Sequence, residues 1–341
     1  MNASQPRHQP GPNGAGVNPL RVGVRVAIRY RLAPGSPESF TDVIGVVTAV
    51  DDAQVTLDSR KGPVSLARAD FVAARAVPPA PVRRGRPHQA VSTVELERLM
   101  ADGWQAVEHT GLGGWLLRAS SGFTRRGNSV LPSGDPSLPL GRAVDYCERW
   151  YAGRDLLAVF HLDLPASGLV EDDPLGAELL GRGYAVDQPT VTMTAASADI
   201  PLLTEHSVPV TMDAALTPVW LQAYAQQRSI TPGVSEQVLT GSPGQLFAST
   251  TAPDGTITAL ARMSVHPGWA GLHALWVEPG ARRQGLARTV VQAVAHLARQ
   301  HRMRSLFLQV EADDDAALAL YASLGFATHH TYVYLVPAST S

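Results

Sequence analysis

The segment Ala281-Arg-Arg-Gln-Gly-Leu-Ala-Arg288 decides the fold of the last third of this chain. It follows the apolar run 272–277, which predicts a strand, and it opens a stretch, 282–301, that predicts a helix. The apolar positions of that helix recur at the spacing of one helical face: Leu286, Val290, Val294 and Leu297. A glycine-containing turn between a strand and a helix presents unpaired N–H groups at the positive end of the helix dipole. The segment therefore predicts an anion site, and the implied ligand is a pyrophosphate.

Side chains around this turn suit the same ligand. Gly285 lacks a side chain that would keep a phosphate away from the backbone. Arg282, Arg283 and Arg288 can add charge-assisted hydrogen bonds. The glycine spacing matches neither the Rossmann fingerprint nor the P-loop, which argues against a dinucleotide or a nucleoside triphosphate.

Two blocks together resemble a known family. Arg282-x-x-Gly285-x-Ala287 after Leu275-Trp-Val277 resembles the acetyl-CoA signature of the GNAT superfamily of N-acetyltransferases. Downstream, Leu308-Gln-Val-Glu311 predicts a strand. The segment Ala316-Leu-Ala-Leu-Tyr-Ala-Ser-Leu-Gly-Phe326 is similar to the closing helix and turn of that superfamily. The resemblance implies an α+β fold with a mixed sheet flanked by helices, and acetyl-CoA as the co-substrate.

The resemblance also implies a role for each block. The backbone of 275–277 would hold the pantetheine arm and polarise the thioester carbonyl, and Tyr321 would protonate the leaving thiolate unless it is an ordinary core aromatic. Asp314 stands where many relatives have Asn, which leaves that contact with pantetheine open; Asp313, Asp314 or Asp315 could instead cap the helix. The residues implied to bind acetyl-CoA are Leu275, Trp276, Val277, Arg282, Arg283, Gln284, Gly285, Leu286, Ala287, Arg288, Asp314 and Tyr321.

The general base stays open at this point. An acceptor amine is mostly protonated at neutral pH and must lose a proton before it attacks the thioester. Glu311 and Glu278 lie nearest the reacting strands, and His273 and His266 are further candidates. A water chain could replace any of these side chains.

The remaining sequence divides into segments that differ in amino-acid composition and in their hydrophobic pattern. Residues 1–19 are predicted to be disordered because they lack apolar residues. Residues 20–78 predict five short strands that resemble an SH3-like β-barrel, and 79–91 read as a Pro- and Arg-rich linker. Residues 92–197 resemble the degenerate N-terminal half of tandem GNAT proteins, without a second acetyl-CoA site, and 208–337 form the predicted catalytic domain.

Candidate acceptor residues come from both halves. Arg125, Arg126 and Asn128 could bind a substrate carboxylate, or they could form a solvated turn. A helix predicted over 213–228 would place Arg228 and Ser229 at the acceptor pocket, whereas Trp220 and Tyr224 share a face that suits a core. His329 and His330 are adjacent in a predicted strand, so they would point to opposite faces, and no metal site is predicted.

The amino-acid composition and the net charge exclude some classes of function. The net charge of -2 and the 45% hydrophobic content favour an ordinary globular protein and argue against a nucleic-acid partner. A linker contact through Arg83, Arg84 and Arg86 is the remaining nucleic-acid alternative. The single cysteine, Cys147, forms no internal disulfide. The expected location is cytoplasmic, because neither a signal peptide nor a run of about 20 apolar residues is found.

The leading hypothesis is therefore an acetyl-CoA-dependent N-acetyltransferase that acts by direct transfer in a ternary complex. The acceptor would be the primary amine of an amino acid such as glutamate, or of a protein or peptide. The alternative is a non-catalytic acetyl-CoA-binding module that docks a partner through its barrel. The sequence leaves the oligomeric state open.

Overall fold

The computed structural model describes residue 20 and residues 24–32, 39–51, 53–59, 62–76, 87–165, 167–205 and 207–338. The chain divides into two compact units, Met1–Arg84 and Gly85–Ser341. The predicted disordered start and the three linker arginines lie outside the described residues. The end of the predicted linker is helical, since Pro87–Ala90 form α1.

The first unit is a small antiparallel sheet, which confirms the five predicted strands. Its sheet order is β4-β3-β2-β1-β5, and Val26, Ile28 and Leu57 are fully buried in its core. Gly45 is required by close packing, because a Cβ atom there would stand 2.6 Å from the Asp58 carbonyl oxygen. Its elements are β1 (Arg25–Arg31), β2 (Phe40–Val50), β3 (Gln54–Ser59), β4 (Gly62–Ala67), η1 (Arg68–Asp70) and β5 (Phe71–Ala76).

The second unit contains two halves, each of which includes three strands followed by helix, strand, helix and strand. The first half comprises α2 (Thr93–Gly103), β6 (Glu108–Leu112), β7 (Trp115–Ala119), β8 (Val130–Leu131), α3 (Leu140–Ala152), β9 (Phe160–Asp163), η2 (Val170–Asp172), α4 (Pro174–Gly181) and β10 (Tyr184–Ala196). The second half comprises β11 (Thr211–Asp213), α5 (Pro218–Tyr224), α6 (Val234–Thr240), β12 (Gln245–Thr251), β13 (Ile257–His266), β14 (Trp269–Val277), η3 (Pro279–Ala281), α7 (Leu286–Gln300), β15 (Ser305–Glu311), α8 (Asp315–Ser323) and β16 (Ala327–Pro337). Within the described ranges, no helix has the length and apolar character needed to span a membrane.

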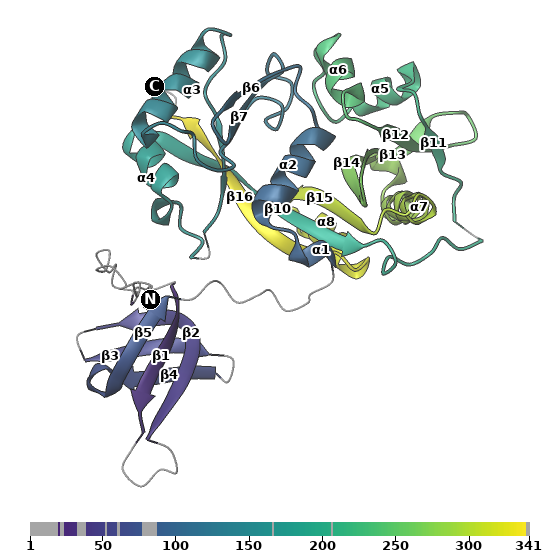
Figure 1. Cartoon of the computed structure of the whole chain (residues 1–341). Coiled ribbons are helices and arrows are strands. Elements are labelled where there is room, and N and C mark those ends of the chain that lie inside the picture. The colour runs from purple at the N-terminus through teal and green to yellow at the C-terminus, as the bar shows by residue number, and fades with distance from the viewer. Residues whose placement is uncertain are drawn as a thin grey trace, which may run out of the picture. The chain divides into compact units, whose positions relative to one another are not determined.

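The two halves share one 11-stranded sheet through an exchange of their last strands. The strand order is β11-β12-β13-β14-β15-β10-β16-β9-β8-β7-β6. Strand β10, which ends the first half, therefore lies against β15 of the second half, and β16 lies against β9 of the first half (Figure 1). Neither half completes its own sheet without the other.

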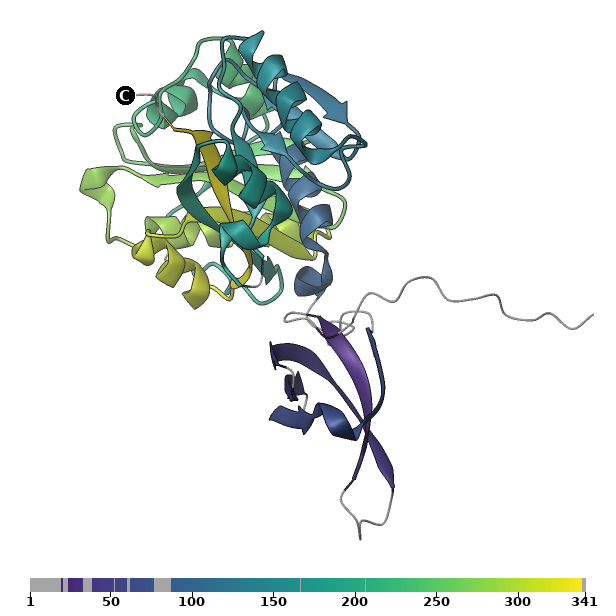
Figure 2. The same cartoon turned by 90° about the vertical axis from the view of Figure 1, so that its left-hand side faces the viewer.

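Each half contains one parallel strand pair joined by a helical crossover. Strands β14 and β15 are parallel and α7 connects them, as α3 connects the parallel pair β8 and β9. Helices cover both faces of the shared sheet (Figure 2). On one face α7 contributes Val290 and Val294 to the largest core cluster, and on the other face Leu96 of α2 packs against Phe307 of β15.

Local signals explain where several helices begin. Ser92 caps α2, because its hydroxyl accepts from the Glu95 N–H while the Glu95 carboxylate accepts from the Ser92 N–H. The helix predicted over 213–228 is wrong in extent. Residues 211–213 form β11, and α5 starts only at Pro218 because Thr217 caps it and proline suits the first helical position.

The prediction that His329 and His330 point to opposite faces is also wrong. Strand β16 pairs His330 with Thr192 but Thr328 with Met193, so His329 is an extra residue in a β-bulge. The bulge brings the two imidazole rings together, with 2.8 Å between their Nδ1 atoms.

Candidate active site

The parallel strands β14 and β15 separate at one end and open the sheet. Their described pairing runs from Trp269↔Ser305 to Leu272↔Leu308 and stops there. Strand β14 then bulges, because its pairing with β13 passes from Arg262↔His273 to Leu260↔Trp276 with Ala274 at a φ of 54°. The backbone from Ala274 to Val277 thus lies beyond the described pairing with β15.

The turn before α7 lies directly after the separated end of β14. Residues 282–285 are exposed, and Arg283 and Gly285 have φ values of 65° and 80°, so α7 begins at Leu286 rather than at the predicted Arg282. Among the described side chains none caps the first turn of α7. A Cβ atom at Gly285 would meet nothing within 4 Å, so its backbone faces open space.

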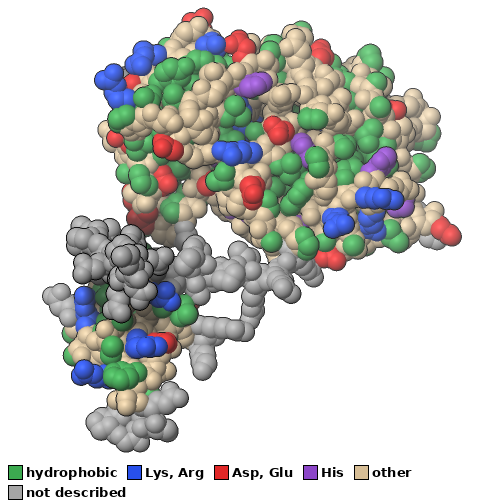
Figure 3. Space-filling view, in the orientation of Figure 1, with side chains coloured by type: hydrophobic (Ala, Val, Ile, Leu, Met, Phe, Trp, Pro, Cys, Tyr) green, Lys and Arg blue, Asp and Glu red, His purple; other side chains and the backbone are tan. Residues whose placement is uncertain are grey.

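Basic side chains surround this turn. Arg282 donates from Nε to the Val277 carbonyl at 3.3 Å, and Arg288 donates to Ser323 Oγ at 2.7 Å on α8. In the space-filling view, Lys and Arg side chains gather over the part of the molecule where α7 lies (Figure 3). An exposed helix start among arginines can hold a phosphorylated ligand.

Tyr321 comes from α8, and Asp314 directly precedes that helix. Tyr321 is about nine-tenths buried, and burial followed by the nearby Asp314 charge raises its pKa above the ordinary range. Tyr321 therefore keeps its phenolic proton at neutral pH. Asp314 accepts from the Ala317 N–H at 2.9 Å and so caps α8, one of the alternatives that the sequence left open.

The candidate bases occupy three different environments. Glu311 is half-exposed at the end of β15, 3.6 Å from Arg228, so the structure brings together two residues predicted for different roles. Glu278 precedes η3 and is partly buried. His273 is buried, and the desolvation of its ring, with the Arg262 charge, holds its pKa well below the ordinary value. His273 and His266 share Ser264 Oγ, at 2.9 and 3.0 Å.

The first half reaches the opening through the loop 120–128. Arg126 donates to Gln309 Oε1 at 2.5 Å, and its guanidinium lies 4.8 Å from the centre of the Trp104 ring. Gln227, beside α5, donates to the Ala274 carbonyl at 3.4 Å. Sequence reasoning missed Trp104 and Gln309, because only the folded chain brings these two positions to Arg126.

The other residues predicted to bind the acceptor differ in whether their side chains are free to contact a substrate. Arg125 forms an ion pair with Asp187. The Asn128 amide donates to the Phe123 and Thr124 carbonyls, and its oxygen accepts from two backbone N–H groups, so it has no amide hydrogen left for a substrate. Ser229 is exposed in the segment that follows α5.

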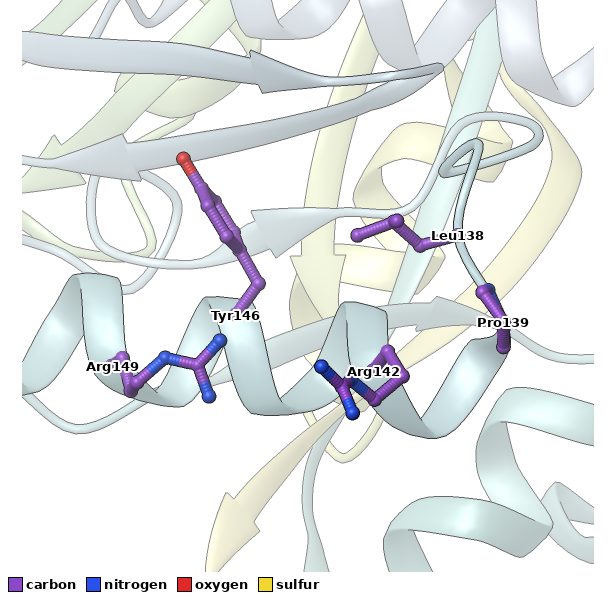
Figure 4. A pocket seen from close by; sticks show the side chains of 5 residues that line it. All are labelled: Leu138, Pro139, Arg142, Tyr146 and Arg149. Atoms are coloured by element: carbon purple, nitrogen blue, oxygen red, sulfur yellow. The ribbon is translucent and has the colours of Figure 1, made fainter.

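A depression of about 430 Å³ lies on α3 in the first half. Arg142, Tyr146 and Arg149 project from the helix along it (Figure 4). Helix α3 is the topological counterpart of α7, yet its N-terminal boundary is Pro139 at a φ of −52°, without an arginine- and glycine-bearing turn. That the first half holds no second acetyl-CoA site stays a prediction.

Comparisons with known proteins match both units. A family model described as "Probable histone acetyltransferase Rv0428c C-terminal" matches residues 92–335, and one described as "Rv0428c N-terminal Sm-like domain" matches residues 20–75. The first unit is thus Sm-like, a class of small, strongly bent β-structures close to the predicted SH3-like barrel.

Curated relatives cover most of the chain. The probable histone acetyltransferase Rv0428c of Mycobacterium tuberculosis is 30% identical over 92% of this chain and 95% of its own length. The uncharacterized N-acetyltransferase YobR of Bacillus subtilis is 30% identical over 69% of this chain and 96% of its own length.

A solved structure agrees in fold. The GCN5-related N-acetyltransferase from Kribbella flavida superposes with a TM-score of 0.53 at 15% identity, over 72% of this chain and 95% of that one. Together with the family models and the curated relatives, this likeness shows that the chain is an acyltransferase and belongs to the Rv0428c family of GNAT-fold N-acetyltransferases.

Proposed function

We propose that this protein transfers the acetyl group of acetyl-CoA directly to the primary amine of a protein or peptide. The observation that carries the proposal is the opening between β14 and β15 beside the exposed, uncapped start of α7. One ligand can reach both features, with its pyrophosphate at the helix start and its thioester in the opening. GNAT enzymes as a family use acetyl-CoA, which supports this choice of donor.

Each part of the donor has a counterpart in the chain. The N–H groups of residues 284–288, with Arg282 and Arg283, would bind the pyrophosphate. The backbone of Leu275, Trp276 and Val277, freed by the bulge at Ala274, would bind the pantetheine arm and donate to the thioester oxygen as negative charge develops there.

The transfer then needs three proton movements. Glu311 takes the first proton from the protonated amine, directly or through one water, and the neutral nitrogen then attacks the thioester carbon. As the carbon–sulfur bond breaks, the nitrogen releases its second proton to water. Tyr321 donates its phenolic proton to the leaving thiolate. We prefer Glu311 to Glu278 because it lies on the same strand face as Gln309, two residues away on β15, where the Arg126 side chain contacts the opening. His273 is a weaker base, since burial lowers its pKa.

The charges around the opening favour a peptide amine over free glutamate. Arg228 faces Glu311, and Arg125 is paired with Asp187, so each arginine already has a carboxylate partner. A dicarboxylate acceptor would have to displace Glu311 and Asp187 from these two arginines before the arginines could bind it. Related proteins named for protein substrates point the same way. One is the probable histone acetyltransferase; another is the [Ribosomal protein bS18]-alanine N-acetyltransferase of Escherichia coli, 30% identical over 30% of this chain.

The test is an acetylation assay with the full-length chain. Acetyl-CoA is supplied with basic peptides carrying free N-termini or lysines, or with glutamate, and CoA release is followed together with the mass of the acceptor. We expect acetylated peptide and little acetylated glutamate, with turnover lost in Glu311→Gln and kept in Glu171→Gln, an exposed glutamate on η2. Acetyl-CoA binding without any acetylated acceptor would overturn the proposal in favour of a binding module.

A further inference from the structure

Four side chains converge beneath α2, outside the opening just described. Glu97 comes from α2, His161 and Asp163 from β9, and His330 from β16; we call them the α2 cluster. The side chains of Glu97, His161 and His330 are 3%, 2% and 8% exposed, and that of Asp163 is 35% exposed. The cluster thus joins the first half to the exchanged strand of the second.

The ligand atoms of this cluster lie close together. His330 Nε2 is 2.7 Å from Glu97 Oε1 and 3.8 Å from Asp163 Oδ1. His161 Nε2 is 3.1 Å from Asp163 Oδ1 and 3.4 Å from Glu97 Oε2. One donor atom from each of Glu97, Asp163 and His330 lies within 4.8 Å of the others. A tetrahedral zinc ion with bonds of about 2.0–2.1 Å needs ligand atoms about 3.4 Å apart, which lies inside this range of distances.

Hydrogen bonds fix the orientation of His330. His329 Nε2 lies 3.0 Å from the Val91 carbonyl, which can only accept, so that nitrogen carries a hydrogen. His329 Nδ1 is then the acceptor in its 2.8 Å contact with His330 Nδ1, which must donate. The other nitrogen of a neutral His330, Nε2, consequently presents a lone pair to the Glu97 carboxylate at 2.7 Å.

Two acceptors at that distance need a positive species between them, either a shared proton or a cation. The Glu97 side chain is only 3% exposed, so an ionised Glu97 requires a nearby counter-charge. His329 holds the second nitrogen of His330 in the way that second-shell groups orient metal-ligating imidazoles. The buried Thr192 hydroxyl, opposite His330 on β10, has no hydrogen-bond partner within the described part of the chain, and a metal-bound water could serve it.

We propose that the α2 cluster binds one Zn²⁺ ion, with Glu97, Asp163 and His330 as its protein ligands, a water as the fourth ligand, and His161 hydrogen-bonded to the ligand Asp163. Zinc accepts a ligand set of imidazole nitrogen and carboxylate oxygen, whereas magnesium and calcium prefer sites made of oxygen ligands alone. The ion would cross-link α2, β9 and β16, because its ligands come from these three elements. It would also lie near the opening, because Thr192 is paired with His330 on one side and with Gln309 on the other. The proposal does not depend on the acceptor of the transfer reaction.

The test uses the full-length chain after removal of metal with a chelator. Zinc is returned by titration and followed by calorimetry, by metal analysis after gel filtration, and by thermal melting. We expect one zinc per chain and a higher melting temperature with Zn²⁺ but not with Mg²⁺.

Two variants locate the ion. His330→Gln and Asp163→Asn should each weaken zinc binding at least tenfold, whereas His301→Gln, at an exposed histidine, should bind as wild type does. Asp163 is partly exposed, so Asp163→Asn keeps the test valid if His330→Gln does not fold. Circular dichroism of the metal-free proteins verifies folding. Absence of stoichiometric binding in wild type, or equal binding by Asp163→Asn, overturns the proposal and leaves a shared proton between Glu97 and His330.

Discussion

Replacing Gly285 by glutamate tests whether the start of α7 is where the donor's pyrophosphate binds. The residue is exposed at a φ of 80°, and a new side chain there would enter open space in front of the helix start. A glutamate at this position meets no neighbouring atom, although its positive φ strains the backbone, and it puts a negative charge where the phosphates should lie. We expect the variant to fold and to lose affinity for CoA.

The size of the loss follows from Coulomb's law. Two unit charges about 5 Å apart repel by about 3 kcal/mol at the effective dielectric constant of about 20 found near protein surfaces. Because the turn is open to solvent, we take about 2 kcal/mol, which corresponds to an affinity about 30-fold lower. The repulsion should shrink as salt is raised towards about 1 M, where the Debye length is only about 3 Å.

A matched control separates this charge effect from backbone strain. Gly233 precedes α6 at the same φ of 80°, is exposed, and has nothing within 4 Å of its Cβ position. Gly233→Glu should therefore show a similar small loss of stability and no change in CoA affinity by titration calorimetry. If Gly285→Glu binds CoA within about threefold of wild type, the pyrophosphate is not at α7, because even 1 kcal/mol of repulsion would exceed that change.

Three further changes test other parts of the structure. Tyr321→Phe should lower kcat by about 10- to 100-fold with little change in the KM for acetyl-CoA, because it removes a proton donor but no binding surface; an unchanged kcat means that Tyr321 only fills the core. Burial lowers the pKa of His266 from 6.5 to about 4, so wild type should lose up to about 3 kcal/mol of stability as pH falls from 6.5 to 4, while the unfolded chain takes up the proton. His266→Gln should lose less over that range in urea unfolding, and parallel curves would contradict this. Tyr151→Phe should cost about 2 kcal/mol, because the buried hydroxyl bonds both the N–H and the carbonyl of Arg118 at 3.1 and 2.8 Å; an unchanged urea midpoint would show that these groups find other partners.

The donor side could be predicted from sequence because its chemistry is local. A strand, a turn with Gly285 and a helix with one apolar face all lie within about thirty consecutive residues, so periodicity and glycine placement suffice. Even there, the start of α7 was predicted four residues early. Arginine at 283 was not expected to adopt the left-handed φ that delays the helix.

The acceptor side and the α2 cluster could not be predicted in the same way. Arg126 meets Gln309 across 183 positions of sequence, and Glu97 meets His330 across 233. Neither contact has a local signature. The bulge at His329 is one extra residue in a strand, and it reverses which face every later side chain would occupy under simple alternation.

The exchange of last strands explains why both contacts exist. Strand β10 lies between β15 and β16, so the strand that carries Glu311 is paired, on the side away from β14, with a strand from the first half. The same arrangement places β16 beside β9 and so brings His330 to Asp163. A first half that is predicted to hold no acetyl-CoA site therefore still has a structural reason to be present. It completes the sheet on which the second half's opening is built, it contacts β15 beside that opening through Arg126, and it supplies three of the four side chains of the α2 cluster.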